Sequence, residues 1–428
     1  MRIRIFGVYL LATFSAGLGA SAHATDGYFS SGYGMKSSGR GGAAQGFTDD
    51  AFGGANNPAS IAWVGNRIDV GATLFVPERG ASRTGSAGAF GAMDPGRDFN
   101  QSSESQRFVI PEFAFSHALP ADFAVGVAVY GNGGLNTNYA GNGVNGFCPQ
   151  GPGTYNALCG QGRLGVNLTQ GLIAPTLAWR IDSKQSIGIS PVLGVQVFKS
   201  YGLQAFAAIS SAPASVTDNR ADTSYGYGAR IGYLLRPTDQ WSIGVSYATR
   251  VYMSRLTHYE GLFAEGGKFD IPSNFSIGVA YKPLAPLTVA LDFERINYSD
   301  VAAVHNPSTN QAPLGSSNGP GFGWDSINVY KLGVEYAATE RLIGRIGFNH
   351  SGNPIAARDV TFNILAPGVV QEHFTSGFTY QLSEHGELTG MYMHAFSHAV
   401  TGPSLIFGGI EQIHMFQNAY GLAYAHKF

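Results

Sequence analysis

The chain of 428 residues carries little charge and has no long hydrophobic run that could cross a bilayer as a helix. Asp, Glu, Lys and Arg make up 13% of the residues, about half of the usual share in a soluble protein. Beyond the N-terminal segment no stretch offers about eighteen consecutive apolar residues, so the sequence predicts no transmembrane helix. The net charge of −2 argues against nucleic acid as a partner, because nucleic-acid-binding domains are usually basic.

The first 24 residues have the pattern of a secretory signal peptide. Arg2 and Arg4 form a basic start, the run from Phe6 to Leu18 is mostly apolar, and Ala22-His23-Ala24 is a small-x-small cleavage site. Cleavage after Ala24 would remove two positive charges and take the net charge from −2 to −4. We therefore predict an exported protein.

Cysteine is almost absent. Cys148 and Cys159 are the only two, and they flank a loop rich in Gly and Asn. In an exported chain we expect them to form a disulfide, because their spacing and the lack of further ligands do not predict a metal site. No phosphate-binding loop and no nucleophile motif is found, so we predict no cofactor, no metal and no enzymatic activity.

From Asn66 onward, apolar residues alternate with small or polar ones. Such rows run from Ile68 to Val76 and recur down to the last row, which runs from Tyr420 to Phe428. This period of two predicts strands with one apolar face. The second face of a soluble sandwich would be rich in Lys and Glu, but here it carries Gly, Ser and Ala. We therefore predict an all-β transmembrane β-barrel over residues 66–428, with its apolar face turned to lipid.

The connections between the rows alternate in length. Short ones are expected at 119–122, 182–185, 236–240, 282–286, 338–341 and 383–386. Long ones are expected near 78–105, 132–167, 200–222, 254–272, 299–324, 351–370 and 398–415. Six short and seven long connections join fourteen antiparallel strands, and short periplasmic turns with long external loops are typical of outer-membrane barrels. The terminal Phe428 fits the C-terminal pattern that barrel-assembly machinery reads in such proteins.

A barrel of this size encloses more space than its own side chains fill. Residues 25–65 precede the first row and are rich in Gly, Ser, Ala and Asn without a clear period. They also carry Tyr28, Phe29, Tyr33, Phe47, Phe52 and Trp63. A flexible exposed leader would leave this aromatic surface in water. We predict that residues 25–65 form a hatch inside the lumen.

Charged and aromatic residues suggest where a ligand could bind. The strand pattern turns Glu112, Arg180, Arg230, Arg250, Asp292, Glu294, Lys331, Glu335 and Arg345 toward the lumen. They form either a mutually paired lining that holds the hatch, or a site in which Arg230, Arg250 or Lys331 binds a carboxylate. The loop aromatics could form an apolar landing site or pack on one another; they are Phe206, Tyr259, Phe263, Phe362, Phe374 and Phe407.

The sequence resembles the FadL-type family of long-chain fatty acid transporters, which includes uptake channels for hydrocarbons such as toluene. Three features carry the resemblance: Asn57-Pro58-Ala59 before the first strand, the rhythm of fourteen strands, and the late strands. The late strands read DSINVYKLGVEYAATERLIGRIGFNHSGNPI and FTSGFTYQLSEHGELTGMYMHAF. The resemblance extends over essentially the whole mature chain.

The resemblance implies a monomeric outer-membrane channel that imports hydrophobic small molecules passively. The substrate would land on the external loops, reach a tighter pocket at the start of the hatch near Tyr28 and Phe29, and leave sideways into the outer-membrane lipid. The exit would lie near Asn57, Pro58 and Ala59, at an inward kink of the third strand. By position, Gly126, Gly131, Gly133 and Gly134 are candidates for that kink. The substrate could be a fatty acid or an aromatic or aliphatic hydrocarbon, and an adhesin or receptor role of the loops stays open.

Overall fold

The computed structural model describes residues 26–148 and 150–428 of the chain. The expected signal peptide, residues 1–24, lies outside this part. None of the described helices is long and apolar enough to cross a membrane.

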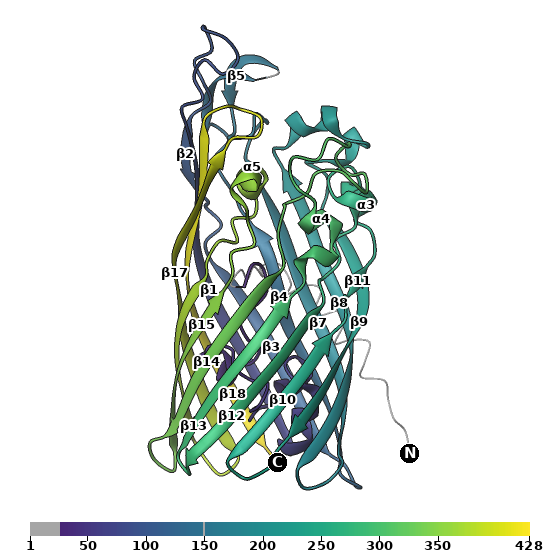
Figure 1. Cartoon of the computed structure of the whole chain (residues 1–428), viewed down its shortest axis with the longest axis vertical. Coiled ribbons are helices and arrows are strands. Elements are labelled where there is room, and N and C mark those ends of the chain that lie inside the picture. The colour runs from purple at the N-terminus through teal and green to yellow at the C-terminus, as the bar shows by residue number, and fades with distance from the viewer. Residues whose placement is uncertain (1–25, 149) are drawn as a thin grey trace.

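Antiparallel strands form a closed barrel around a short N-terminal segment (Figure 1). The main sheet has sixteen strands. Two of them do not add to the wall: β2 (Phe99–Ser102) is a short addition to β1, and β11 (Tyr252–Met253) continues the line of β10 along β9. The remaining fourteen are β1 (Arg67–Thr84), β3 (Phe108–Ala118), β4 (Phe123–Asn136), β7 (Gly165–Arg180), β8 (Gln185–Tyr201), β9 (Asp222–Leu235), β10 (Trp241–Ala248), β12 (Asn274–Leu284), β13 (Leu287–Ile296), β14 (Ile327–Ala337), β15 (Leu342–Ser351), β16 (Glu372–Gln381), β17 (Gly386–Pro403) and β18 (Ile410–Lys427). This confirms the predicted fold class.

The first and last strands of the wall close the barrel. β1 pairs with β18 over its whole length, from Arg67 opposite Lys427 to Thr84 opposite Ile410. No free sheet edge is therefore left at this seam, as a lipid environment requires.

The two faces of the wall follow the alternation in the sequence. Along β8, the outward side chains of Ile187 and Ile189 are 48% and 46% exposed, whereas Ser186 and Ser190 on either side of them are buried inside the barrel. Large apolar groups on the outside and small polar groups inside are the reverse of a soluble protein and match a barrel in lipid.

The two ends of the barrel differ in the length of their connections (Figure 1). The long loops contain the hairpin of β5 (Val144–Cys148) and β6 (Gly151–Tyr155), and a disulfide joins Cys148 at the end of β5 to Cys159 beyond β6. They also contain the short helices η3 (Gln204–Ile209), η4 (Pro213–Ser215), η5 (Thr257–Tyr259), α3 (Ala264–Gly267), η6 (Tyr298–Asp300), α4 (Ala302–His305), η7 (Ala357–Asp359) and α5 (Val360–Asn363).

One predicted loop is wrong. Residues 398–415 do not form a long connection, because β17 runs on to Pro403 and β18 begins at Ile410. The turn between them contains Gly408 and Gly409, both at positive φ, a conformation that glycine adopts without steric cost.

The N-terminal segment fills the short-turn half of the lumen and appears in dark purple in Figure 1. It contains only three short helices, α2 (Met35–Gly39), η1 (Ala51–Gly54) and η2 (Pro58–Trp63). Most of its side chains are buried, including Tyr28, Phe29, Met35 and Phe52. The segment is therefore packed inside the barrel, and we call residues 26–65 the hatch.

Candidate functional site

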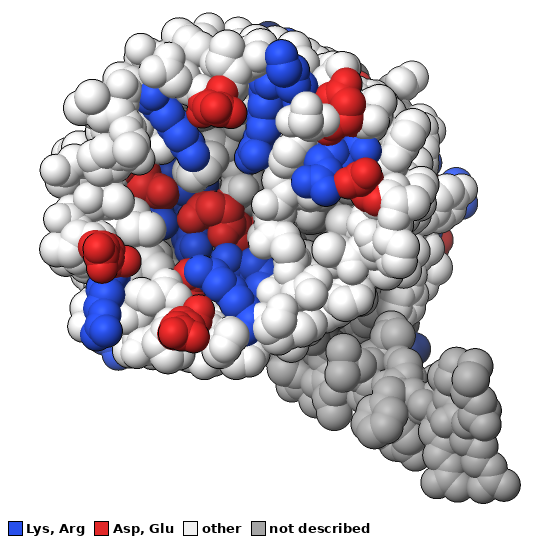
Figure 2. Space-filling view, turned by 90° about the horizontal axis from the view of Figure 1, so that it is seen from below, with Lys and Arg blue, Asp and Glu red and all other residues white. Residues whose placement is uncertain are grey.

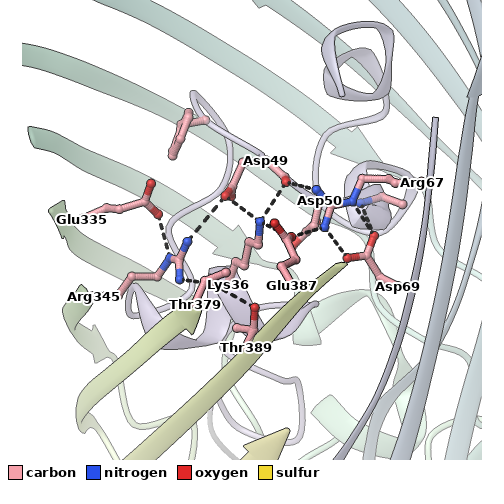
Figure 3. A network of polar contacts seen from close by, with 12 residues as sticks. Lys36, Asp49, Asp50, Arg67, Asp69, Glu335, Arg345, Thr379, Glu387 and Thr389 are labelled. Atoms are coloured by element: carbon pink, nitrogen blue, oxygen red, sulfur yellow. Dashed lines mark hydrogen bonds and ion pairs between the residues drawn. The ribbon is translucent and has the colours of Figure 1, made fainter. Parts of the chain in front are cut away.

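Buried ion pairs hold the base of the hatch to the wall (Figure 3). Lys36 Nζ lies 2.7 Å from a carboxylate oxygen of Glu387 and 3.0 Å from one of Asp49. Arg40 reaches Asp49 at 2.9 Å and Glu335 at 2.8 Å. Seen from the short-turn end, acidic and basic side chains gather around the centre of the barrel (Figure 2). Removing one partner from such a buried pair is strongly destabilising, so the base of the hatch is firmly anchored.

The tripeptide Asn57-Pro58-Ala59 caps η2 and docks it on the wall. The Asn57 side-chain oxygen accepts a hydrogen bond from Ala59 N, and Pro58 takes the first helical position, where it needs no N–H partner. The Asn57 amide donates to the carbonyls of Gln45 and Tyr233 at 3.0 and 3.1 Å. A Cβ at Gly232 would lie 2.1 Å from the Asn57 side-chain oxygen, so only glycine admits this contact. The tripeptide thus lies against β9, and Gly188 of β8 touches Pro58 in the same way.

The start of the hatch lies in a cluster of aromatic rings. The ring of Tyr28 is 5.3 Å from that of Tyr298, 5.8 Å from Trp324 and 6.2 Å from Phe269. Phe29 packs on Tyr28 and on the edge of Tyr298. Tyr28 and Phe29 could be predicted from the sequence, but the other three rings could not, because they lie in long loops without any periodic pattern.

Asp26 holds the first described turn of the hatch. Its side chain accepts a hydrogen bond from Asn349 at 3.3 Å, and its carbonyl accepts one from the Tyr298 hydroxyl. Its second carboxylate oxygen is buried and has no hydrogen-bond partner. Burial raises the pKa of Asp26 from 3.8 to about 7, and the charge of Lys331 opposes this shift.

The wall has an open edge between β3 and β4. These strands pair from Ala118 opposite Ala124 to Phe113 opposite Val129, and the pairing ends there. Above this point β3 still pairs with β1, and β4 with β7. The edge of β4 pairs instead with the hatch, through a bridge between Phe29 and Gly133.

The same stretch of β4 contains an irregularity. Its register with β7 shifts between Gly131 and Gly133, which leaves Asn132 as an extra residue, as in a β-bulge. The carbonyl of Asn132 accepts a hydrogen bond from Ser30 N at 3.1 Å. Gly134 follows in regular pairing with Thr169, and Gly126 lies in the paired part of the strand, opposite Ser116.

A small cavity lies on the inner side of this edge. Hatch residues Ser30 and Tyr33 form one wall, and Ile110, Glu112 and Tyr130 form the other. The lining is mixed polar and apolar, and the Tyr33 ring packs at a tilt against that of Tyr130, with the ring centroids 4.4 Å apart. This cavity therefore lies where the start of the hatch meets the unpaired stretch of β3 and β4.

A second cavity lies among the long loops and is lined almost entirely by apolar side chains. The residues are Leu158, Val166, Leu203, Phe206, Leu262, Phe263, Ala303, Leu314, Pro320, Gly321, Phe322, Phe362 and Leu365. The ring of Phe263 is 4.9 Å from that of Phe269, which itself contacts Tyr28. A continuous series of aromatic rings thus leads from this loop cavity to the start of the hatch.

Three of the six expected landing-site aromatics line the loop cavity: Phe206, Phe263 and Phe362. Tyr259 packs nearby on Phe198, and Phe407 packs on Arg83. The prediction for Phe374 is wrong, because this residue lies within β16 with its side chain exposed on the outer face of the wall.

The three candidate cations differ in their partners. Lys331 is 2.6 Å from Glu294, so its charge is matched. The prediction that Arg250 lies in a strand is wrong. It lies just beyond the end of β10, where it contacts the Asp300 carbonyl and Asp270. Arg230 is buried in the lumen and donates to the Asn56 carbonyl at 3.2 Å. Within the described residues, no ion pair is formed by Arg230. Of the remaining lumen residues, Asp292, Glu335 and Arg345 are buried and contact the hatch, whereas Arg180 lies half exposed at the short-turn end.

A family model described as outer membrane protein transport protein (OMPP1/FadL/TodX) matches residues 11–402. The chain belongs to this family. It is an outer-membrane protein of a family of transport proteins, and the resemblance noted in the sequence is confirmed. No curated protein sequence matches the chain significantly.

Solved structures of the FadL/TodX family share the fold. The Pseudomonas putida toluene transporter TodX is 16% identical, with a TM-score of 0.69, over 93% of this chain and 99% of that chain. A Pseudomonas aeruginosa FadL homologue is 14% identical, with a TM-score of 0.68, over 94% of this chain and all of that one (100%). The Ralstonia pickettii toluene transporter TbuX is 16% identical, with a TM-score of 0.63, over 93% and 99% of the two chains.

Proposed function

We propose that this FadL/TodX-family protein imports neutral hydrophobic small molecules by passive diffusion and releases them sideways through the edge between β3 and β4. The observation that carries the proposal is the end of the β3–β4 pairing at Phe113 and Val129, where the start of the hatch covers the gap. An unpaired edge in a membrane barrel is costly unless a protein segment or water satisfies its polar groups. An exit that the hatch closes would account for this unpaired edge.

The route begins at the loop cavity. A molecule bound among its apolar side chains would pass along Phe263 and Phe269 to the ring of Tyr28. Movement of residues 26–30 away from Gly133 would then open the edge of β4 to the outer leaflet. The ion pairs at the base of the hatch stay in place, so the lumen remains closed to water and no energy source is needed.

The lining of the route favours a neutral substrate. The loop cavity contains no charged residue, and two of the three candidate cations already have carboxylate neighbours. The related transporters TodX and TbuX are described as toluene transporters. A long-chain fatty acid is the second candidate, and the buried Arg230 without an ion pair is the observation that favours it.

A reversible cross-link across the edge tests the proposal. Continuing the β3–β4 register beyond Phe113 and Val129 brings Pro111 opposite Gly131. A Pro111→Cys/Gly131→Cys variant, joined by a short bis-methanethiosulfonate reagent, should lose uptake of toluene and dodecane into cells and regain it with a reductant.

The matched control is Phe115→Cys/Val127→Cys, which joins a pair that is already in register below the opening. Its cross-link should leave uptake unchanged, and wild-type protein given the same reagents controls for reduction of the native disulfide. Unimpaired uptake with Pro111→Cys and Gly131→Cys joined would rule out the sideways exit. Laurate is tested in the same cells: its uptake would favour the fatty acid, and uptake of toluene and dodecane without laurate would favour the neutral substrate.

A further inference from the structure

The gap between β3 and β4 is closed again toward the long-loop end of the barrel. Glu104 N donates to the Asn138 carbonyl at 2.9 Å, and Asn138 N donates to the Ser103 hydroxyl at 3.0 Å. These residues flank β3 and β4 on the side of the long loops. The two edges thus separate beyond Phe113 and Val129 and meet again before the loops. The gap is therefore a window with a lower and an upper rim.

Arg79 of β1 lies across the upper rim on the inner side of the wall. One nitrogen of its guanidinium, Nη1, donates to the Ser105 carbonyl at 3.2 Å and to the Asn136 carbonyl at 2.6 Å. Ser105 belongs to the edge that continues into β3, and Asn136 is the last residue of β4. A single side chain from the neighbouring strand thus holds both edges of the window. Its two bonds lie nearer to the window than the backbone contact between Glu104 and Asn138.

The Arg79 guanidinium is buried and has no acidic partner. Arg79 is 3% exposed, its guanidinium carbon lies 5.8 Å from the centre of the Phe108 ring, and its Nη2 has no hydrogen-bond partner. Within the described residues 26–148 and 150–428, no ion pair is formed by Arg79. A buried charge without a counterion is costly, and an apolar side chain would pack on Phe108 without that cost. The charge provides two strong bonds across the rim, because a charged donor binds a carbonyl more tightly than a neutral one.

We propose that Arg79 fixes the upper rim of the window and thereby limits the size of the molecule that leaves through it. The inference rests on the proposed function, in which this window is the exit. Without the bonds of Arg79 to Ser105 and Asn136, the rim retreats to Glu104 and Asn138. This retreat is one residue on the β3 edge and two on the β4 edge, which lengthens the window by roughly 3–7 Å. Arg79 is thus a positioning residue that sets an upper size limit.

The first test replaces Arg79 by methionine, which keeps an unbranched apolar chain against Phe108 and removes the donors. In the mature full-length protein in detergent micelles, amide exchange at Glu104 and Asn138 should become about tenfold faster or more in Arg79→Met, as expected for the loss of a hydrogen bond to a charged group. In cells, the ratio of pyrene uptake to toluene uptake should rise. A merely weakened barrel would lower both uptake rates together and leave their ratio unchanged. Unchanged exchange at the rim, or an unchanged uptake ratio, would overturn the inference.

The matched control is Arg163→Met. Arg163 spans the same rim on the outer, exposed side, where it lies 2.5 Å from a carboxylate oxygen of Glu104 and donates to the Asn138 side-chain oxygen at 2.5 Å. Exposed pairs contribute little, so this variant should keep the wild-type uptake ratio. An equal rise of the ratio in Arg163→Met and Arg79→Met would remove the special role of the buried guanidinium.

A second test leaves Arg79 in place and so does not depend on how Arg79→Met folds. The variant Glu104→Cys/Asn138→Cys, joined by a short bis-methanethiosulfonate reagent, fixes the contact beyond Arg79. If Arg79 ends the window, this cross-link should leave the uptake of toluene and of pyrene unchanged, with wild-type protein given the same reagents as the control. A loss of uptake would show that molecules leave beyond Arg79 and would contradict the inference.

The inference and the proposed function fail in different ways. If the Pro111→Cys/Gly131→Cys cross-link blocks uptake but Arg79→Met leaves the ratio of pyrene to toluene uptake unchanged, the exit stands and the role of Arg79 is wrong. If that cross-link leaves the uptake of both molecules intact, the sideways exit is wrong and the size limit falls with it.

Discussion

Adding one methyl group at Gly133 should loosen the start of the hatch and leave the barrel intact. A Cβ at this position would lie 1.7 Å from the carbonyl oxygen of Tyr28, about half of the normal distance between a carbon and an oxygen in contact. The strand conformation of Gly133 suits alanine, so the cost falls on the contact with Tyr28. Overpacking of this kind costs about 1–3 kcal/mol. That amount raises the ratio of open to closed hatch start by about 5- to 150-fold.

Gly133→Ala should therefore speed amide exchange in residues 26–33 and raise the initial rate of toluene uptake by cells. The matched control is Gly344→Ala in β15, where a Cβ meets nothing within 4 Å. The reasoning is refuted if Gly133→Ala behaves like Gly344→Ala in both assays, or if exchange rises in residues 26–33 and uptake falls.

Three further predictions address the anchor, the pH dependence and the loops. Lys36→Met leaves Glu387 without one of its buried partners and should lower the free energy of unfolding by about 3–5 kcal/mol. Gel assays should show this as unfolding at a lower temperature. The control Arg163→Met breaks an exposed pair and should change the free energy of unfolding by less than about 1 kcal/mol. Burial raises the pKa of Asp26 from 3.8 to about 7, so closure of the hatch start is strongest below pH about 4 and weakens as the pH rises through 7. The protection of the amides in residues 26–33, taken relative to their intrinsic exchange rate at each pH, should then be lower at pH 8 than at pH 5, and Asp26→Asn should flatten this difference. Replacing Cys148 and Cys159 by Ser should expose the β5–β6 hairpin to proteases, because removing a disulfide across a loop of this length costs about 3 kcal/mol of stabilisation. Toluene uptake should stay unchanged. A loss of uptake would show that the hairpin shapes the loop cavity.

The wall of the barrel could be predicted because lipid outside and the hatch inside impose a period of two on each strand. The prediction failed where that period is broken locally. The pairing of β17 with β18 shifts between Ala395 and His398, so the alternation stops there and the last part of both strands resembled a loop. Arg250 was misplaced for a related reason, because β10 ends at Ala248 and the chain resumes its pairing with β9 only at Tyr252.

The cluster of aromatic rings around Tyr28 could not be predicted from local pattern. Its rings come from the loop after β11, from η6 and from the segment before β14, positions that are far apart in the sequence and carry no shared period. Only closure of the barrel brings these loops together over the start of the hatch. The glycines near the expected kink were found by their place in the third strand, but the sequence does not distinguish Gly133, which touches Tyr28, from Gly126, which lies against Ile61.

The way in which the hatch is held decides what kind of passage the protein can form. Residues 36–49 are tied to the wall by charged side chains that are mostly buried, and breaking one such buried pair costs about 3–5 kcal/mol. Residues 26–30 are held by neutral hydrogen bonds and ring contacts, each worth about 0.5–1.5 kcal/mol. On the proposed route, the start of the hatch would therefore move before its base. The resulting opening would face the edge of β4, whereas Lys36, Arg40 and their partners would still block the lumen below. A hydrophobic molecule could then leave sideways without water and ions following it through the barrel.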